Sequence, residues 1–522
     1  MSSYKKNAYK FSTIVAMGGF VFGLDAALIS GTVKFISQEF GLNEMQLGMV
    51  VGAPALGVLL ALLFAGYACN KYGRKSTLQI VAALYVISAI GSTMAADYWS
   101  LLAFRFLGGL AFTSISLASM YIGEIAPPKL RGKLVTMIQI NIVIGLSGAY
   151  FINYLILQLG VSDLEWVTNL GLKENTWRWM LGSEILPALI WFLLLFSVPR
   201  SPVWLFLNER IAEAKQTLLK LLPENEVDEH LLEMKNSQEV GVEDRSVMAQ
   251  LKSVFSKEFR VIFIIAITLA IAQQTSGINA ILFYAPTVFE QIGLGTDAAF
   301  MQAIWTGLTG LLFTILGLVL VDKIGRRPMI IGGMLWVVIS LGIAFYGFKT
   351  ATYTLTKEAI TEMAEIKNPN RLNGMIDVEY GSDIELKSAL IKAVGEDEAR
   401  QYSGLLIQKS AKINAILILI GILSFIAAFH FSIGPVMWVL FSEIFPNSIR
   451  GIAIPFFTLI TSTVSWLIQA FFPTQLSSFG ISNTLLFYAS TVFIGMLILS
   501  KYLVETKGLS IEEIQAKLTK KV

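Results

Sequence analysis

Cysteine, histidine and charged residues are all scarce in this sequence. The single cysteine, Cys69, excludes disulfide bonds within the chain, and with only two histidines it leaves too few ligands for a zinc site. Charged residues make up 15% of the 522 residues, against about 25% in an average soluble domain. The net charge of +3 is small for this length and includes no basic run. We therefore expect no metal, no cofactor and no nucleic-acid partner.

Hydrophobic residues are abundant, at 55% of the sequence, and many of them form long apolar segments. A bilayer requires about 20 apolar residues in each spanning helix. Twelve segments meet this requirement, six on each side of a polar stretch at 200–257. They lie near 11–34, 45–68, 77–96, 99–122, 134–158, 178–198, 259–290, 298–321, 328–348, 413–441, 452–474 and 483–503. The sequence thus predicts an all-α membrane protein with twelve transmembrane helices in two six-helix bundles.

The polar stretches set the predicted domain boundaries. The first bundle occupies 1–198, a linker occupies 199–257, the second bundle occupies 258–503, and a tail occupies 504–522. Amphipathic patterns in the linker and the tail predict helices that lie at the membrane interface. Short loops rich in Lys and Arg follow even-numbered spans, which places both termini in the cytoplasm by the positive-inside rule. The expected location is the cell (inner) membrane.

An insertion at about 350–411 interrupts the second bundle and is too polar to span a membrane. The helical pattern at 384–394 predicts a small external subdomain. One interpretation is a solvated loop that the fold tolerates. The alternative is a lid over the outer mouth.

Two loop motifs occur once in each half of the chain. Residues 70–75 (NKYGRK) recur as 322–327 (DKIGRR), and the Glu-to-Arg spacing of Glu124 and Arg131 recurs in Glu443 and Arg450. Seven residues are two helical turns, so we expect the glutamate and the arginine of each motif to lie at the same helix end. There the glutamates can form ion pairs with basic residues of neighbouring loops. The alternative is charge that only sets topology. The predicted gate residues are Arg74, Glu124, Arg131, Asp322, Arg326, Glu443 and Arg450.

A polar run at 273–286 (QQTSGINAILFYAP) follows an unbroken apolar stretch. An unpaired amide in the membrane costs several kcal/mol, and Gly277 and Pro286 weaken the helix, as expected where a discontinuous helix lines a polar cavity. Neutral amides both donate and accept, which suits an uncharged ligand dense in hydroxyls, such as a sugar. The alternative is that the amides only join helices. The predicted ligand-binding residues of this run are Gln273, Gln274, Asn279 and Tyr284.

Asp25 lies midway along the first span, where a carboxylate costs roughly 2.5 to 3.5 kcal/mol. Burial and a nearby cation act on its protonation in opposite directions, so Asp25 is a candidate for reversible proton binding. Arg105, early in the fourth span, is the expected partner. A purely structural ion pair is the alternative.

The run at 273–286 resembles the seventh-helix signature of the sugar porter family within the major facilitator superfamily, and the repeated loop motifs resemble those of the superfamily. The resemblance covers almost the whole chain and is closest to bacterial proton-coupled xylose and hexose symporters. It implies a proton-coupling role for Asp25 and Arg105, because uniporters of the family commonly lack that aspartate. It also implies sugar contacts from Gln139, Gly434, Trp438, Phe22 and Phe429.

Four departures from the family pattern bear on the latch and on the pocket. Asn70 stands where an aspartate is usual, which predicts a weaker first-half latch. Gly310 stands where the eighth helix usually offers an asparagine, and Thr461 and Ser462 stand where the eleventh offers an amide and a tryptophan. These departures predict a roomier pocket.

The predicted function is inward transport of a monosaccharide by alternating access, coupled to a proton, in a chain expected to be a monomer in the bilayer. One rival is a facilitative uniporter in which Asp25 is structural. Another is a sugar-sensing receptor that shares the fold. A membrane enzyme is the weakest rival, because no span offers a nucleophile with a base or a metal cluster.

Overall fold

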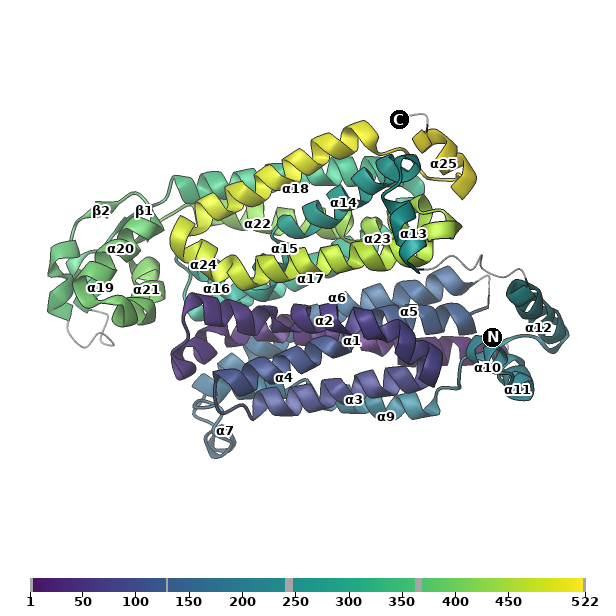
Figure 1. Ribbon diagram of the computed structural model, residues 1–522. Helices are drawn as coiled ribbons and strands as arrows, with labels where there is room; N and C mark the ends of the chain where they lie inside the picture. Colours follow the sequence, from purple (N-terminus) through teal and green to yellow (C-terminus); the bar gives the residue numbers. More distant parts are fainter. Residues whose placement is uncertain (1–2, 128–129, 240–246, 362–368, 520–522) are drawn as a thin grey trace.

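The computed structural model describes residues 3–127, 130–239, 247–361 and 369–519. The rest, including 240–246 of the linker and 362–368 of the insertion, lies outside the described residues. The described helices form two bundles that lie side by side (Figure 1).

The first bundle runs from the N-terminus to residue 197. Its helices are α1 (Ser3–Phe40), α2 (Glu44–Tyr72), α3 (Arg74–Thr93), α4 (Tyr98–Ala111), α5 (Ser114–Ile125), α6 (Arg131–Val161), α7 (Glu165–Asn169), α8 (Thr176–Gly182), α9 (Ile185–Leu194) and the 3₁₀ turn η2 (Leu195–Ser197). Helix α1 packs along α6, and α2 packs along α4. The fourth predicted span, 99–122, is interrupted between α4 and α5, at residues 112–113.

The second bundle has the same arrangement with more interruptions. Its helices are α14 (Arg260–Thr275), α15 (Ile278–Phe283), α16 (Ala285–Glu290), α17 (Thr296–Ile324), α18 (Arg326–Lys349), α22 (Ala415–Phe431), α23 (Ile433–Ile444) and α24 (Asn447–Tyr502), preceded by the 3₁₀ turn η3 (Lys257–Phe259). The described residues include eleven helices long and apolar enough to span a membrane. The last of them, α24, holds two helices joined at Gly480, whose φ of 73° and ψ of 167° are not helical. Counted in this way, the spans number twelve, as predicted.

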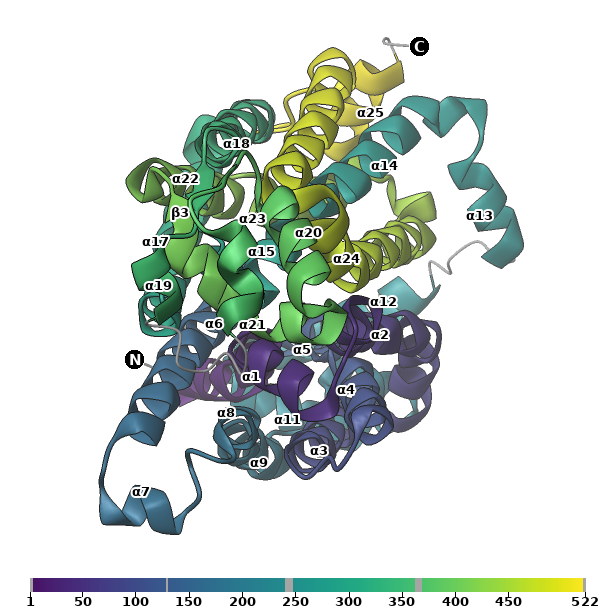
Figure 2. The ribbon, with the colours of Figure 1, turned by 90° about the vertical axis from the view of Figure 1, so that its left-hand side faces the viewer.

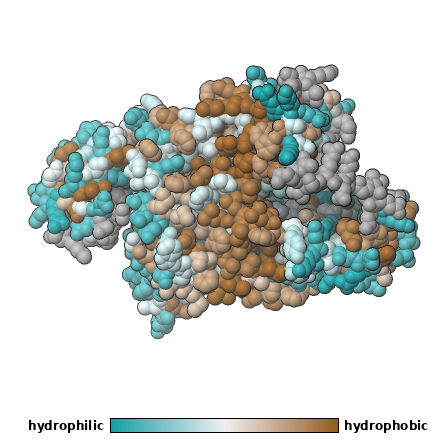
Figure 3. All heavy atoms as spheres, viewed as in Figure 1, coloured by the Kyte–Doolittle hydropathy of each residue, from teal (hydrophilic) through white to brown (hydrophobic). Residues whose placement is uncertain are grey.

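Both termini lie at one end of the bundles, which we call the terminal end (Figure 1). The linker helices are α10 (Pro202–Leu207), α11 (Ile211–Leu221), α12 (Glu224–Glu239) and α13 (Val247–Val254), and the tail forms α25 (Ile511–Thr519). Helix α11 buries Leu218 and Leu221, and the carbonyl of Lys220 accepts a hydrogen bond from Asn7 of α1 at 3.0 Å. On the face drawn in Figure 3, hydrophobic residues form a band across the middle of the molecule, and hydrophilic residues gather at both ends.

The insertion forms a folded subdomain at the opposite end, which we call the insertion end (Figures 1 and 2). It contains β1 (Thr352–Thr354), α19 (Lys357–Thr361), the 3₁₀ turn η4 (Pro369–Met375), β2 (Glu379–Tyr380), α20 (Asp383–Val394), α21 (Glu396–Ser410) and β3 (Ala411–Lys412). The antiparallel strands pair in the order β2-β1-β3, with Tyr353 opposite both Tyr380 and Ala411. Tyr353, Leu386 and Leu406 are buried in a separate core. The insertion is therefore folded rather than a structureless loop. The sequence analysis missed its three strands, because they are too short to show an alternating pattern.

Candidate functional site

The polar run of the seventh span lies at a break in the helix. Helix α14 ends at Thr275, and Gly277 adopts a left-handed conformation, with φ at 79° and ψ at 12°, before α15 begins. A side chain at Gly277 would collide with the ring of Tyr488, because a Cβ would lie 2.1 Å from the ring. A second break at Tyr284 precedes α16, which has Pro286 in its first turn. The predicted discontinuity is therefore present.

The break brings three amides into one chain of hydrogen bonds. The Nε2 of Gln273 donates to the carbonyl oxygens of Ile433 and Gly434 at 3.3 and 3.2 Å. The Nε2 of Gln274 donates to Oε1 of Gln273 at 3.0 Å, and Nδ2 of Asn279 donates to Oε1 of Gln274 at 2.8 Å. We call Gln273, Gln274 and Asn279 the amide relay. Its described bonds leave Oδ1 of Asn279 and one N–H of Gln274 available for a ligand.

The eleventh span extends this relay through residues that the sequence analysis missed. The Nδ2 of Asn279 also donates to the hydroxyl of Ser465 at 2.8 Å, and Nε2 of Gln469 donates to that hydroxyl at 2.7 Å. The hydroxyl of Tyr284 donates to the carbonyl of Gln469 at 3.0 Å. Thr461, in contrast, bonds to its own helix at the carbonyl of Phe457. The polar residues that this helix adds to the relay thus lie one turn after Thr461 and Ser462, the positions predicted by counting. In the sequence, only the spacing of Ser465, Trp466 and Gln469 indicated them.

The other predicted sugar contacts fall into two groups. Gly434 is joined to the relay through its carbonyl, and the ring of Phe429 packs over it, 2.9 Å from where a Cβ would lie. Trp438, on the next turn of α23, keeps 42% of its surface exposed. Phe22 and Gln139 belong to the first bundle. Phe22 packs edge-on against Phe112 at 4.5 Å between ring centroids, and Gln139 is half-buried on α6.

At Gly310, a residue from another helix takes the space that a side chain would occupy. The imidazole of His430 fills the space beside this glycine, because Nε2 lies 3.2 Å from where a Cβ of Gly310 would be. The Nδ1 of His430 is hydrogen-bonded to the hydroxyl of Thr314 at 3.0 Å. The small residue on α17 is thus matched by a larger one on α22.

The first bundle buries charge in its middle. Asp25 and Arg105 form the expected ion pair, and each is 2% exposed. Glu184, which the sequence analysis missed, is 4% exposed and lies near this pair. Among the described residues, Oδ2 of Asp25, Nε of Arg105 and Oε1 of Glu184 have no hydrogen-bond partner. We call Asp25, Arg105 and Glu184 the charged triad.

Each bundle carries an ion-paired clamp at the terminal end. In the first, Nε of Arg74 donates to Glu124 at 2.8 Å, and the hydroxyl of Ser201 donates to the other carboxylate oxygen. In the second, Nη2 of Arg326 lies 2.8 Å from Glu443, and the hydroxyl of Thr506 donates to Glu443 at 2.6 Å. We call these the first clamp and the second clamp. Each joins helices within a single bundle.

The second clamp holds two further carboxylates. Asp322 lies 2.9 Å from Nη2 of Arg326. Glu505, beyond the last span, accepts backbone N–H bonds from Arg326, Arg327 and Lys507 at 2.8 to 3.0 Å. Partial burial raises the pKa of Glu505, but the backbone donors outweigh burial and hold that pKa below its ordinary value. The contacts of Glu505 therefore stabilise the fold above the ordinary glutamate pKa and are lost as pH falls through the lowered value.

Arg131 and Arg450 do not occupy the predicted positions. Glu124 lies near the end of α5 whereas Arg131 begins α6, and Glu443 lies on α23 whereas Arg450 lies on α24. The two helical turns expected between each acid and base are therefore absent, because a helix ends between them. Arg450 donates instead to the carbonyl of Phe445 at 2.9 and 3.1 Å. Within the described part of the chain, Arg131 has no ion pair.

The described polar contacts between the bundles lie in the half nearer the insertion end. Lys34 of α1 contacts Thr296 at 2.9 Å and Glu290 at 3.5 Å. The hydroxyl of Tyr150 on α6 donates to the carbonyl of Leu282 at 2.6 Å. Backbones also approach closely in this half, since a Cβ at Gly48 would lie 1.8 Å from the carbonyl oxygen of Ala470. The bundles are thus locked together at the insertion end.

Comparisons with known proteins agree with this arrangement. The Sugar (and other) transporter family matches residues 11–366 and 401–518. The chain is 30% identical to the arabinose-proton symporter of Bacillus subtilis (strain 168), over 97% of this chain and 93% of that protein. It is 31% identical to the D-xylose-proton symporter of Escherichia coli (strain K12), over 99% and 97%. An inward open structure of the xylose transporter XylE from E. coli matches with a TM-score of 0.73 and 27% identity, over 98% of this chain and 99% of that one.

Proposed function

Because this chain belongs to the sugar porter family of the major facilitator superfamily, we propose that it carries a monosaccharide into the cell together with a proton by alternating access. The family match confirms the predicted family and the fold class of twelve spanning helices in two bundles. The protein is a multi-pass membrane transporter. We place it in the cell membrane as a monomer, with the terminal end and the linker helices in the cytoplasm.

The amide relay is the observation that carries the sugar assignment. Gln273 and Gln274 are 3% and 9% exposed, yet their amides bond mainly to one another and to backbone carbonyls. A relay without a formal charge can donate to and accept from hydroxyl groups at a low desolvation cost. Phe429 and Trp438 supply aromatic surface of the kind that packs on a sugar ring. These features support Gln273, Gln274, Asn279, Gly434, Phe429 and Trp438 as one binding site. Tyr284 is linked to it through Gln469 and Ser465.

Sugar contacts from the first bundle complete the proposal. Gln139 and Phe22 lie on α6 and α1, and these two helices pack along one another. A sugar held by the relay of one bundle and by Gln139 of the other would change its contacts when the bundles move. Such differential contact is what couples binding to a conformational change.

The charged triad supports proton coupling. Two carboxylates beside one guanidinium carry an excess negative charge when both are ionised, and a buried excess charge is costly. Uptake of one proton removes that excess. We assign the transported proton to Asp25, with Arg105 as its counter-ion and Glu184 as a neighbouring carboxylate.

The contacts at the insertion end support an inward-facing state. If the terminal end faces the cytoplasm, the bundles are closed toward the outside and joined across Lys34, Glu290 and Thr296. The similarity to inward open and partially occluded inward open structures of XylE agrees with this assignment. In the opposite state the gate residues Arg74, Glu124, Arg131, Asp322, Arg326, Glu443 and Arg450 would lie near the closed side.

Uptake into proteoliposomes tests this function. Purified protein is reconstituted, and a panel of labelled pentoses and hexoses is supplied with and without an imposed pH gradient. Accumulation above the outside concentration only when protons flow inward supports symport. Equilibration that ignores the gradient would identify a uniporter, and sugar binding without uptake would identify a receptor.

A further inference from the structure

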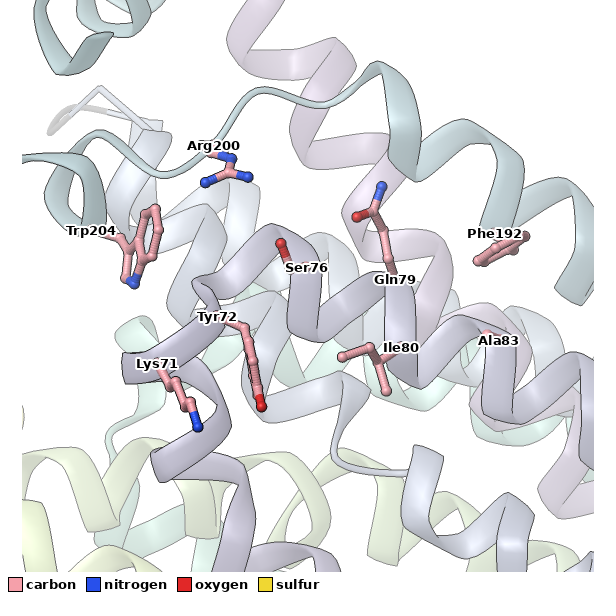
Figure 4. Close-up of a pocket in the computed structure, with 9 residues that line it drawn as sticks. All are labelled: Lys71, Tyr72, Ser76, Gln79, Ile80, Ala83, Phe192, Arg200 and Trp204. Carbon is pink, nitrogen blue, oxygen red and sulfur yellow. The ribbon is translucent and has the colours of Figure 1, made fainter. Parts of the chain in front are cut away.

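A groove of about 540 Å³ opens on the outer surface of the first bundle at the terminal end (Figure 4). It lies between α3 on one side and the α9–α10 connection on the other. It is separate from the amide relay and from the charged triad. None of the nine described residues that line it is acidic.

The groove is cationic at its membrane boundary. Lys71 is in the last turn of α2, and Arg200 follows directly after the sixth span. Both side chains rest on aromatic rings, with Lys71 Nζ 5.4 Å from the ring centre of Tyr72 and the Arg200 guanidinium 5.4 Å from that of Trp204. Two exposed cations without a lining acid favour an anion.

The groove becomes apolar toward the middle of the bilayer. Ser76, Gln79, Ile80 and Ala83 lie along one face of α3, and Ala83 is about 10 Å from Ser76 along the helix axis. Ile80 is 50% exposed, and Phe192 of α9 lines the far end. A ligand that fills the groove therefore needs an anionic head and an apolar chain.

We propose that this groove binds one anionic glycerophospholipid, with its phosphate at Arg200, Lys71 at the opposite edge of the cationic part, and an acyl chain along Ile80, Ala83 and Phe192. Ser76 and Gln79 can bond the glycerol and ester oxygens between these two parts. Basic pockets between membrane helices on the cytoplasmic side recognise such head groups.

A lipid in this groove would also contact the support of the first clamp. The indole N–H of Trp204 donates to the carbonyl of Asn70 at 2.9 Å, and its ring packs against Gly73, 2.9 Å from where a Cβ would lie. Gly73 precedes Arg74, the cation of the first clamp. A lipid that fixes the position of Trp204 would therefore also stabilise the turn at 70–73, which positions Arg74 for its ion pair with Glu124. The matching positions of the second bundle, Pro328 and Ile331, lack the polar side chains of Ser76 and Gln79.

Native mass spectrometry of the detergent-solubilised full chain tests the proposal. Dioleoylphosphatidylglycerol is titrated, with dioleoylphosphatidylcholine as the zwitterionic control and glycerol phosphate as the head group without chains. Lys71→Gln with Arg200→Gln should weaken the affinity for phosphatidylglycerol about 25-fold, since each cation near the surface contributes on the order of fivefold. Ala83→Phe should lower it without changing charge, because the ring fills the acyl part of the groove.

Lys323→Gln with Lys501→Gln is the matched control, since it removes two cations from the same end of the second bundle and should retain wild-type occupancy. Equal phosphatidylglycerol binding by wild type and both groove variants would overturn the proposal. So would equal binding of the two lipids by wild type. Displacement of phosphatidylglycerol by glycerol phosphate at equal concentration would identify a free phosphate site instead of a lipid site.

Discussion

At the terminal end, Arg74 binds Glu124 in the first bundle, and Arg326 binds Glu443 in the second at nearly the same distance. In the middle of the membrane the likeness ends. The first bundle buries Asp25, Arg105 and Glu184, whereas the second buries uncharged amides. The two bundles thus share the ion-paired clamp at the terminal end, but one buries charged side chains in its interior and the other buries neutral amides.

This difference separates two tasks that a symporter must link. A charged group can respond to a proton but attracts any counter-ion, whereas neutral amides discriminate hydroxyl patterns but do not titrate. Placing each set in its own bundle lets the movement between bundles link them. We expect contacts between the bundles, such as that of Lys34 with Thr296, to break when the bundles move, and the proposed coupling depends on that change.

Asp25→Asn should have the largest effect. The amide keeps the volume of the carboxyl but cannot bind and release a proton, so position 25 no longer responds to pH. We expect complete loss of sugar accumulation under an imposed pH gradient, with sugar exchange between equal concentrations retained. Counterflow and gradient-driven uptake in the same proteoliposomes measure the two activities. A variant that still concentrates sugar as wild type does would exclude Asp25 as the proton site and leave the amide relay untouched.

Gln274→Ala should leave coupling intact and weaken sugar binding by one to two decades. The loss of one or two hydrogen bonds, at about 1 to 1.5 kcal/mol each, accounts for this range. Thr275→Ala is the control, because the Thr275 hydroxyl bonds to the carbonyl of Ile271 in its own helix at 3.0 Å. Calorimetric titration with the transported sugar gives the affinities. Equal affinities for Gln274→Ala and Thr275→Ala would remove the relay from the sugar site.

Much of this contrast could be predicted from local sequence. Spanning helices follow from apolar length, the helix break follows from Gly277, and a carboxylate amid apolar residues marks Asp25. Glu184 and Ser465 were missed because their importance depends on neighbours distant in the chain. The same holds for His430, which packs beside Gly310 of another helix. How two helices pack against one another cannot be read from the sequence of either helix alone.

The errors at Arg131 and Arg450 have a different origin. The Glu-to-Arg spacing was measured along a helix that in fact ends between the two residues. A motif spacing constrains geometry only when one element contains it. The clamps instead use Ser201 and Thr506, which the sequence places after the sixth and twelfth spans and far from their glutamates.

Removing the clamp arginines should have an intermediate effect that distinguishes the bundles. Arg74→Gln leaves Glu124, whose side chain is 13% exposed, with only the Ser201 hydroxyl, and should destabilise the protein by about 1 to 3 kcal/mol. Arg326→Gln should cost less, because Glu443 is 23% exposed and better solvated. Arg131→Gln removes the same charge without breaking a described ion pair. Thermal unfolding in detergent gives the order, and an equal loss for Arg131→Gln and Arg74→Gln would contradict it.

Exchanging the residue that distinguishes the clamps should have the smallest effect. Asp322 pairs with Arg326 four residues later, and Asn70 holds the same place relative to Arg74 without a charge. Because the Asp322 side chain is 78% exposed, such a pair contributes only a few tenths of a kcal/mol and is screened by salt. Asn70→Asp should therefore raise the melting temperature slightly, Asp322→Asn should lower it by a similar amount, and both shifts should shrink at high salt. If Asn70→Asp instead lowers the melting temperature, the added carboxylate repels Glu124 more than it attracts Arg74, and the first clamp works better with one acid than with two.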